Sequence, residues 1–179
     1  MADDCPRCIV FGVGNPDRGD DGAGPAAARQ LLELPLPDVE IIEHGGEATK
    51  LVAKMGGAAC VFLIDACASG ARPGTIHRFD VSTAPVPAEV ALGLSTHGFG
   101  LAAAIELARS LGQLPHQCIV YAIEGASFTT GAPLSPRVAA GVARVVRRVG
   151  DEIADCVHQG GGQRDERQQL THRLCGGPY

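Results

Sequence analysis

Two aspartates and a histidine, far apart in the sequence, could together bind a metal ion or move a proton. Asp21 follows one apolar segment, Asp65 ends another, and His97 precedes a segment of helical periodicity. Two carboxylates and an imidazole form a mixed oxygen and nitrogen donor set, which suits a borderline divalent metal such as zinc or nickel. The same groups could instead provide a general base and the partner that orients it.

Each of these residues also has an ordinary structural role open to it. Asp21 or its neighbour Asp20 could cap the following helix, and Asp65 could close a turn through its own backbone. His97 could cap the helix that begins near Gly98. A carboxylate that follows a wholly apolar strand must be paired or solvated, so the argument for a chemical role is strongest for Asp65.

Alternating apolar and helical segments predict the frame that would position these side chains. Strands are expected at 8–13, 39–43, 58–64, 75–79 and 117–123, and helices at 25–34, 48–55, 98–111 and 137–157. The short connection after Asp65 leaves no room for a crossover helix, so strand 75–79 should run antiparallel to 58–64. The pattern predicts an α/β fold, a three-layer α/β/α sandwich of about five strands, mostly parallel with one antiparallel strand.

The chain length and composition divide the sequence into a domain and a tail. A chain of 179 residues is long enough for one domain with a single core. We expect residues 1–158 to form this α/β domain, with 82–94 as a loop inside it. Residues 159–179 are rich in Gly, Gln and Arg, and we expect them to form a mobile or weakly docked tail.

Charge and hydropathy argue against two classes of partner. The formal net charge of −5 is unlike that of a general nucleic-acid binder. No apolar run approaches the roughly 18 residues that span a bilayer, and the acidic N-terminus does not resemble a signal peptide. Seven cysteines scattered through apolar segments do not suggest a disulfide framework. We therefore expect a cytoplasmic protein with no nucleic-acid or membrane partner.

Three of the cysteines could have a chemical role, as a Cys-x-x-Cys pair or as a nucleophile. Cys5 and Cys8 form a Cys-x-x-Cys pair, but the pair precedes a strand, and no second pair completes a structural zinc site. This favours an incidental pair. Cys67, two residues after Asp65, could serve as a nucleophile, but no neighbour in the sequence would clearly lower the pKa of its thiol.

Five short motifs occur in order between residues 8 and 150. They are residues 12–22 (GVGNPDRGDDG), 62–66 (FLIDA), 95–101 (STHGFGL), 122–124 (AIE) and 134–136 (LSP). In this order they resemble the motifs of the [NiFe]-hydrogenase maturation endopeptidase family. The specificity of the resemblance comes from the ordered set, since no single motif would suffice.

The resemblance implies a phosphorylase/hydrolase-like sandwich and a particular hydrolase activity. The family's enzymes remove a short C-terminal peptide from the hydrogenase large-subunit precursor once nickel has been inserted. The nickel is carried by the substrate, and the positions that would recognise it correspond to Asp21, Asp65 and His97. The same three residues would be catalytic, either as an aspartic-type protease or with metal-assisted chemistry.

The resemblance also implies supporting residues around this trio. Asp20 and Asn15 would lie behind the metal ligands, where they would orient them. Gly45 and Gly46 would contact the substrate. His44 stands where many family members have an aspartate, so it could supply a further imidazole.

Two other functions fit parts of the pattern. The trio could form a non-catalytic, nickel-sensing chaperone that binds the large subunit without cutting it. Residues 12–16 also resemble the opening motif of peptidyl-tRNA hydrolases. That family needs a His-Asn pair where this chain has Asp20 and Asp21, and it needs a basic surface facing RNA, which the acidic charge does not favour.

Overall fold

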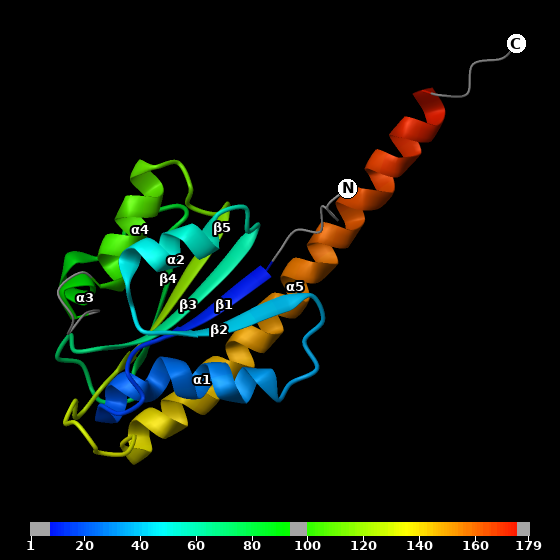
Figure 1. Ribbon diagram of the computed structural model, residues 1–179. Helices are drawn as coiled ribbons and strands as arrows, with labels where there is room; N and C mark the ends of the chain where they lie inside the picture. The colour runs from blue at the N-terminus through cyan, green and yellow to red at the C-terminus, as the bar shows by residue number, and fades with distance from the viewer. Residues whose placement is uncertain (1–7, 94–99, 175–179) are drawn as a thin grey trace, which may run out of the picture.

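The computed structural model describes residues 8–93 and 100–174. Its centre is a five-stranded sheet with the strand order β2-β1-β3-β5-β4 (Figure 1). The strands are β1 (Cys8–Val13), β2 (Val39–His44), β3 (Cys60–Cys67), β4 (Ile76–Asp80) and β5 (Gln117–Glu124). All neighbouring pairs are parallel except β4 and β5, which are antiparallel. The mostly parallel sheet with one antiparallel strand is therefore confirmed.

Helices cover both faces of the sheet and complete the three layers (Figure 1). Helices α2 (Ala48–Met55) and α4 (Leu101–Ser110) lie on one face, and α1 (Ala23–Leu32) and α5 (Pro136–Leu174) lie on the other. Successive side chains of a strand point to opposite faces. Phe11 accordingly packs in the core on the α2 and α4 side, and Phe62 packs in the core on the α1 and α5 side.

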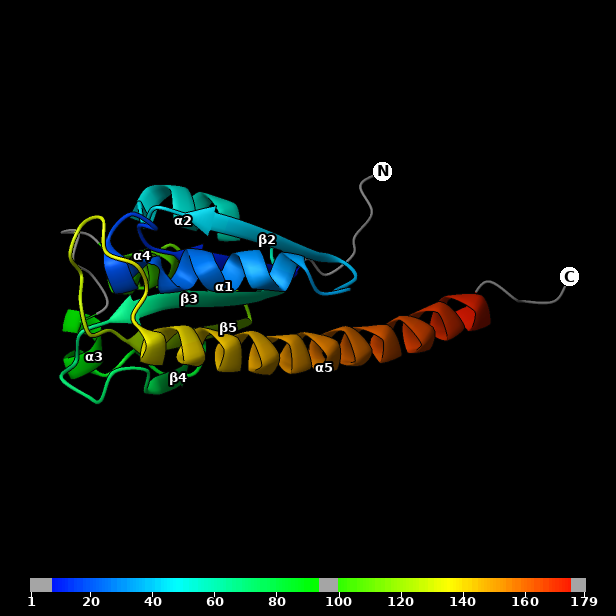
Figure 2. The same cartoon turned by 90° about the horizontal axis from the view of Figure 1, so that it is seen from below.

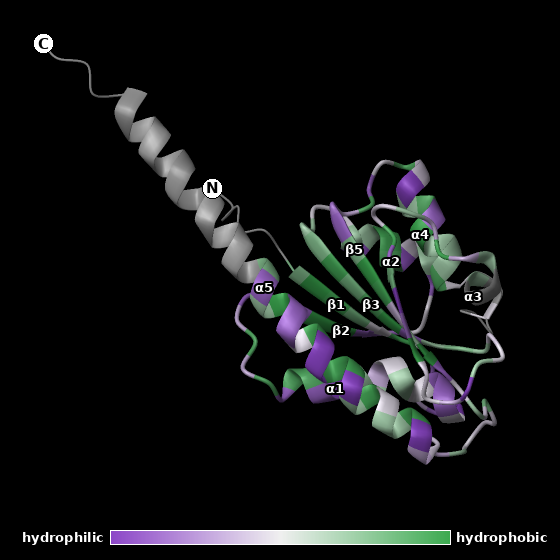
Figure 3. Cartoon of the chain, turned by 180° about the vertical axis from the view of Figure 1, so that it is seen from behind, coloured by the Kyte–Doolittle hydropathy of each residue, from purple (hydrophilic) through white to green (hydrophobic). Residues whose placement is uncertain are grey.

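The central strands are apolar along their whole length because both of their faces are covered. Every residue of β1 and β3 is buried, and so is every residue of β5 except the first. Figure 3 shows this as the green, hydrophobic colouring of the middle of the sheet. The edge strands β2 and β4 are only partly buried.

The structure differs from the sequence-based expectation at four elements. Helix α3 (Ala88–Gly93) forms within the expected loop, since the residues after Pro87 are good helix formers and proline is tolerated at a helix start. β3 and β5 each extend beyond their expected ends, to Cys67 and Glu124. Helix α5 begins at Pro136, one residue before its expected start, and continues to Leu174; its last turns are rich in Gln and Arg, which favour helix.

Helix α5 is fastened to the antiparallel edge of the sheet by a polar network. The Arg78 guanidinium of β4 donates to both carboxylate oxygens of Glu152 at 2.8 Å, and the Tyr121 hydroxyl of β5 donates to the same carboxylate. Beyond this point α5 runs past the sheet (Figure 2). The docking of residues 159–179 stays a prediction. Within the described ranges, no helix has the length and apolarity that would let it cross a membrane.

Candidate functional site

The fold brings Asp21 and Asp65 together at the carboxyl ends of two neighbouring strands. Asp21 lies in the short 3-10 helix η1 (Gly19–Gly22), which follows β1, and Asp65 lies in β3, which pairs with β1. Each residue is only 6% exposed. The carboxyl ends of parallel strands are where open α/β sheets place their sites, and this edge now carries two buried acids.

Burial dominates the electrostatics of Asp65. It raises the pKa of the Asp65 carboxyl well above its ordinary value, and the negative charge of Asp21 acts in the same direction. The Ala66 amide donates to Oδ1 of Asp65 at 2.7 Å and opposes the shift only in part. Asp65 therefore keeps its proton to a higher pH than an ordinary aspartate, and a bound cation would reverse that preference.

Asp21 is positioned by the turn that follows β1. The Asn15 amide donates to Oδ2 of Asp21 at 3.2 Å, while the Asn15 side chain accepts from the Asp17 amide at 2.9 Å and holds the turn. Gly14 has a φ of +133°, and a Cβ at this position would collide with the carbonyl oxygen of Asp21. Backbone freedom at Gly14 thus lets the turn approach the acid closely.

Asp20 serves a different purpose from Asp21. It is fully buried, and its carboxylate accepts hydrogen bonds from the amides of Ala126, Ser127 and Ser135 at 2.7–2.9 Å. The Ser135 hydroxyl donates to both of its oxygens. Burial opposes ionisation, but these bonds outweigh it and lower the pKa of Asp20. The bonds occupy both oxygens, so Asp20 ties η1 to the loop between β5 and α5.

Neither acid caps helix α1, although the sequence left that role open. The N-cap of α1 is Gly22, and no side chain bonds to the amides there. This removes the simplest structural explanation for Asp21.

His97 lies outside the described residues. Gly93, the last residue of α3, is the last described residue before this gap. Its carbonyl accepts a hydrogen bond from the Ala68 amide at 3.1 Å, so the end of α3 lies next to the end of β3.

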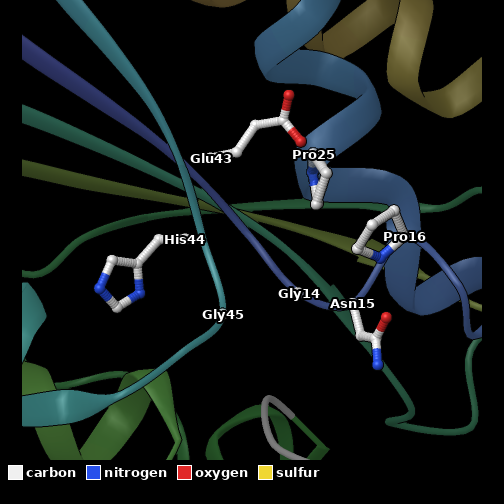
Figure 4. A pocket seen from close by; sticks show the side chains of 7 residues that line it. All are labelled: Gly14, Asn15, Pro16, Pro25, Glu43, His44 and Gly45. Carbon is white, nitrogen blue, oxygen red and sulfur yellow. The ribbon is translucent and has the colours of Figure 1, made fainter.

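A pocket of about 420 Å³ lies beside the Asp21 turn (Figure 4). Its walls are the turn after β1, the start of α1 and the end of β2, with the lining residues Gly14, Asn15, Pro16, Pro25, Glu43, His44 and Gly45. Gly45 was expected to contact substrate, and it is on the pocket wall. Gly46 follows it in the loop and donates its amide to Nδ1 of His44 at 2.9 Å.

His44 is arranged as a hydrogen-bond donor rather than a metal ligand. Partial burial lowers the pKa of His44, which favours the neutral ring. Because Nδ1 accepts from the Gly46 amide, the ring proton lies on Nε2. Binding a metal through Nε2 would move the ring proton to Nδ1 and so break the hydrogen bond from the Gly46 amide.

Cys67, which the sequence offered as a nucleophile, is not activated. Burial raises the pKa of the Cys67 thiol, which disfavours the thiolate form that a nucleophile needs. Cys8 opens β1, and Cys5 lies outside the described residues. The Cys-x-x-Cys pair therefore has only one member in the described fold.

The sequence assigned no functional role to His77, or to Glu124, the last residue of the motif at 122–124. Glu124 is the last residue of β5, just as Asp65 lies near the end of β3. Glu124 is only 2% exposed. The signal in the sequence for Glu124 is the one that marks Asp65, a charged residue after a long apolar strand. His77 lies on β4, and its Nε2 is 3.7 Å from Oε2 of Glu124.

The fold is shared with endopeptidases of known structure. It resembles HybD, a hydrogenase maturating endopeptidase from Escherichia coli, with a TM-score of 0.69 and 23% identity, covering 84% of this chain and 93% of that one. It also resembles a second endopeptidase from Escherichia coli, with a TM-score of 0.69 and 26% identity, covering 80% of this chain and 89% of that one. These likenesses define the class of fold, a three-layer α/β/α sandwich that the chain shares with both endopeptidases.

Residues 26–152 match the family model HycI, described as hydrogenase maturation protease. The chain belongs to the hydrogenase maturation protease family. It is also 27% identical over 137 residues to the hydrogenase expression/formation protein HupD of Thiocapsa roseopersicina. That match covers 74% of this chain and 61% of the relative's own length. Asp65 and His97 lie inside the range matched by the family model, and Asp21 lies just before it.

Proposed function

We propose that the protein is an endopeptidase that removes the C-terminal peptide of a [NiFe]-hydrogenase large-subunit precursor after nickel insertion. The observation that carries the proposal is the buried pair Asp21 and Asp65 at the carboxyl edge of the sheet. Membership of the hydrogenase maturation protease family supplies the class of substrate.

In this proposal the nickel belongs to the substrate, and Asp21, Asp65 and His97 recognise it. Two carboxylates and an imidazole suit a borderline divalent ion. Asp65 is held in a setting that penalises its negative charge, and an arriving cation would relieve that penalty. Three protein ligands leave further coordination positions for the cysteines of the precursor. A precursor that lacks nickel would leave the acids unpaired and would bind weakly.

The peptide next to the cleaved bond would lie in the pocket beside Asn15. The pocket is adjacent to Asp21 because the Asn15 amide bonds to that carboxylate. Gly45 leaves its wall free of bulky side chains, and Nε2 of His44 can donate to a peptide carbonyl. The nickel and the pocket would together fix the peptide relative to the two acids, which is the positioning that hydrolysis requires.

Two routes of water activation use these residues. In the first, one aspartate accepts a proton from the attacking water, and the other supplies a proton, as in pairs of acids with unequal environments. In the second, the substrate's nickel polarises the peptide carbonyl and the acids only hold the ion.

The test is the mass of the large-subunit precursor after incubation with the wild-type protein. The proposal predicts loss of a short C-terminal peptide from the nickel-loaded precursor and no change in the nickel-free precursor. Unchanged mass in both, with binding to the nickel-loaded precursor retained, would instead establish the nickel-sensing chaperone. Cleavage of both precursors to the same extent would show that nickel is not recognised.

A further inference from the structure

Three side chains that commonly bind metals meet at the end of β3, β5 and β4. Sγ of Cys67, Nε2 of His77 and a carboxylate oxygen of Glu124 all lie within 4.8 Å of one another. Cys67 and Glu124 are paired in the β3–β5 register, and His77 lies on β4, which pairs with the other side of β5. Adjacent strands therefore hold the three groups in a fixed relation.

The separations are close to those of a tetrahedral zinc site. Zinc bonds of about 2.0–2.3 Å at tetrahedral angles place ligand atoms about 3.3–3.6 Å apart. Sγ of Cys67 is 3.2 Å from Oε2 of Glu124, and Nε2 of His77 is 3.7 Å from the same oxygen. The sulfur-to-nitrogen separation is within 4.8 Å, so it would have to close by no more than about 1.3 Å on metal binding.

Glu124 is oriented as carboxylate ligands usually are. The Ser69 hydroxyl donates to Oε2 at 2.7 Å and the Gly70 amide donates to Oε1 at 2.8 Å. Burial opposes the charge, but these bonds and the one from Cys67 outweigh it and lower the pKa of Glu124. The cluster thus contains a buried carboxylate whose orientation is fixed by neighbouring hydrogen-bond donors.

His77 carries an unsatisfied group within the cluster. Its Nε2 is buried and has no hydrogen-bond partner, which is costly for a polar atom. The ring stacks on Phe79, with centroids 6.2 Å apart and planes 8° apart, so its orientation is fixed. The His77 side chain is 24% exposed, which leaves a route for an ion to enter.

We propose that Cys67, His77 and Glu124 form a zinc site that is separate from the Asp21–Asp65 pair. Sulfur, nitrogen and oxygen donors together suit this borderline ion, and three protein ligands leave one position for water. The Cys67 thiol, which donates to Glu124 in the structure, would release its proton to solvent as Sγ binds the ion. The site would join three strands at the edge next to Asp65, whatever reaction that edge performs.

Cobalt binding to the full-length, chelator-treated protein tests the proposal. Co²⁺ is expected to bind one ion per chain with a thiolate-to-metal absorption band in the near ultraviolet, and Zn²⁺ should displace it. Cys67→Ser should lose the band. His77→Gln, a change on a partly exposed edge strand, should keep the fold by circular dichroism and weaken the affinity at least about tenfold.

Two variants serve as controls. Cys118→Ser removes a buried thiol on the same face of β5, and Asp21→Asn alters the aspartate pair; both should retain the band. The proposal is overturned if folded wild type gives no band with Co²⁺, or if Cys67→Ser keeps it. A band that disappears in Asp21→Asn would also overturn it, because the ion would then lie at the other site.

Discussion

At the scale of single residues, buried acids at one edge of the sheet have opposite environments. Asp20 accepts bonds from a loop and a helix start, and its charge is stabilised. Asp65 has one amide partner and a nearby acid, and its charge is penalised. Asp21 accepts a hydrogen bond from the Asn15 amide. Differences of this kind separate residues that hold a fold from residues that bind ions or move protons.

Substitutions at Asp20 and Asp21 should therefore have different effects. Asp21→Asn should lower processing at least about 100-fold, the scale of a lost acid–base group, and change the free energy of unfolding by less than about 1 kcal/mol. Asp20→Asn should lower the free energy of unfolding by about 2–3 kcal/mol, since an amide cannot accept all of the bonds that the carboxylate accepts. Cleavage assays and urea unfolding would measure both. The reverse pattern would mean that the two roles are exchanged.

The raised pKa of Asp65 predicts a pH dependence of stability. As the pH rises above the unfolded pKa, near 3.8, the unfolded chain loses the Asp65 proton while the folded protein retains it. The stability contribution of Asp65 is therefore full below that pH and is lost as the pH rises toward the folded pKa. Asp65→Asn should be more stable than wild type at pH 7, and the gain should shrink at pH 4. Chemical unfolding at both pH values measures this, and an equal difference at both would contradict it.

At the scale of elements, the site depends on a close approach between the turn after β1 and helix η1. Gly14→Ala should impair processing and lower the free energy of unfolding by about 1–3 kcal/mol, because its positive φ and the Asp21 carbonyl both exclude a Cβ. Gly57 is a matched control, with a φ of +79° and no atom near the added Cβ. Gly57→Ala should cost about 1 kcal/mol and leave processing unchanged. Equal loss of processing in both variants would mean that the approach to Asp21 is unimportant.

The elements also show how far the sequence could predict the structure. The buried strands β1, β3 and β5 are continuous apolar runs, and a serine followed by proline, as at Ser135-Pro136, is typical of a helix start, so these were predictable. Asp21 lies next to Asp65 because β1 and β3 are parallel neighbours in the sheet. The bonds of Asp20 to Ala126 and Ser135 join residues more than a hundred positions apart, so no local pattern shows them. The meeting of Cys67 with His77 likewise depends on β4 pairing with β5 rather than β3.

At the scale of the whole molecule, the described packing of α5 lies in its first half. Its buried apolar residues run from Val138 to Ile153, and Glu152 bonds to Arg78 and Tyr121. Removal of residues 159–179 should therefore change the Tm by less than about 2 °C. Glu152→Gln in the full chain should lower the free energy of unfolding by about 1–3 kcal/mol. A fall in Tm of more than about 5 °C on truncation would show that the tail packs on the domain.

The sheet edge, the pocket and the family together lead to one central claim, that the Asp21–Asp65 pair is the active site of a nickel-dependent endopeptidase. The most direct test is the mass of the nickel-loaded large-subunit precursor after incubation with wild type, Asp65→Asn and the control Asp80→Asn. The claim predicts loss of the C-terminal peptide with wild type and Asp80→Asn, and an intact precursor with folded Asp65→Asn. Normal processing by Asp65→Asn would contradict it.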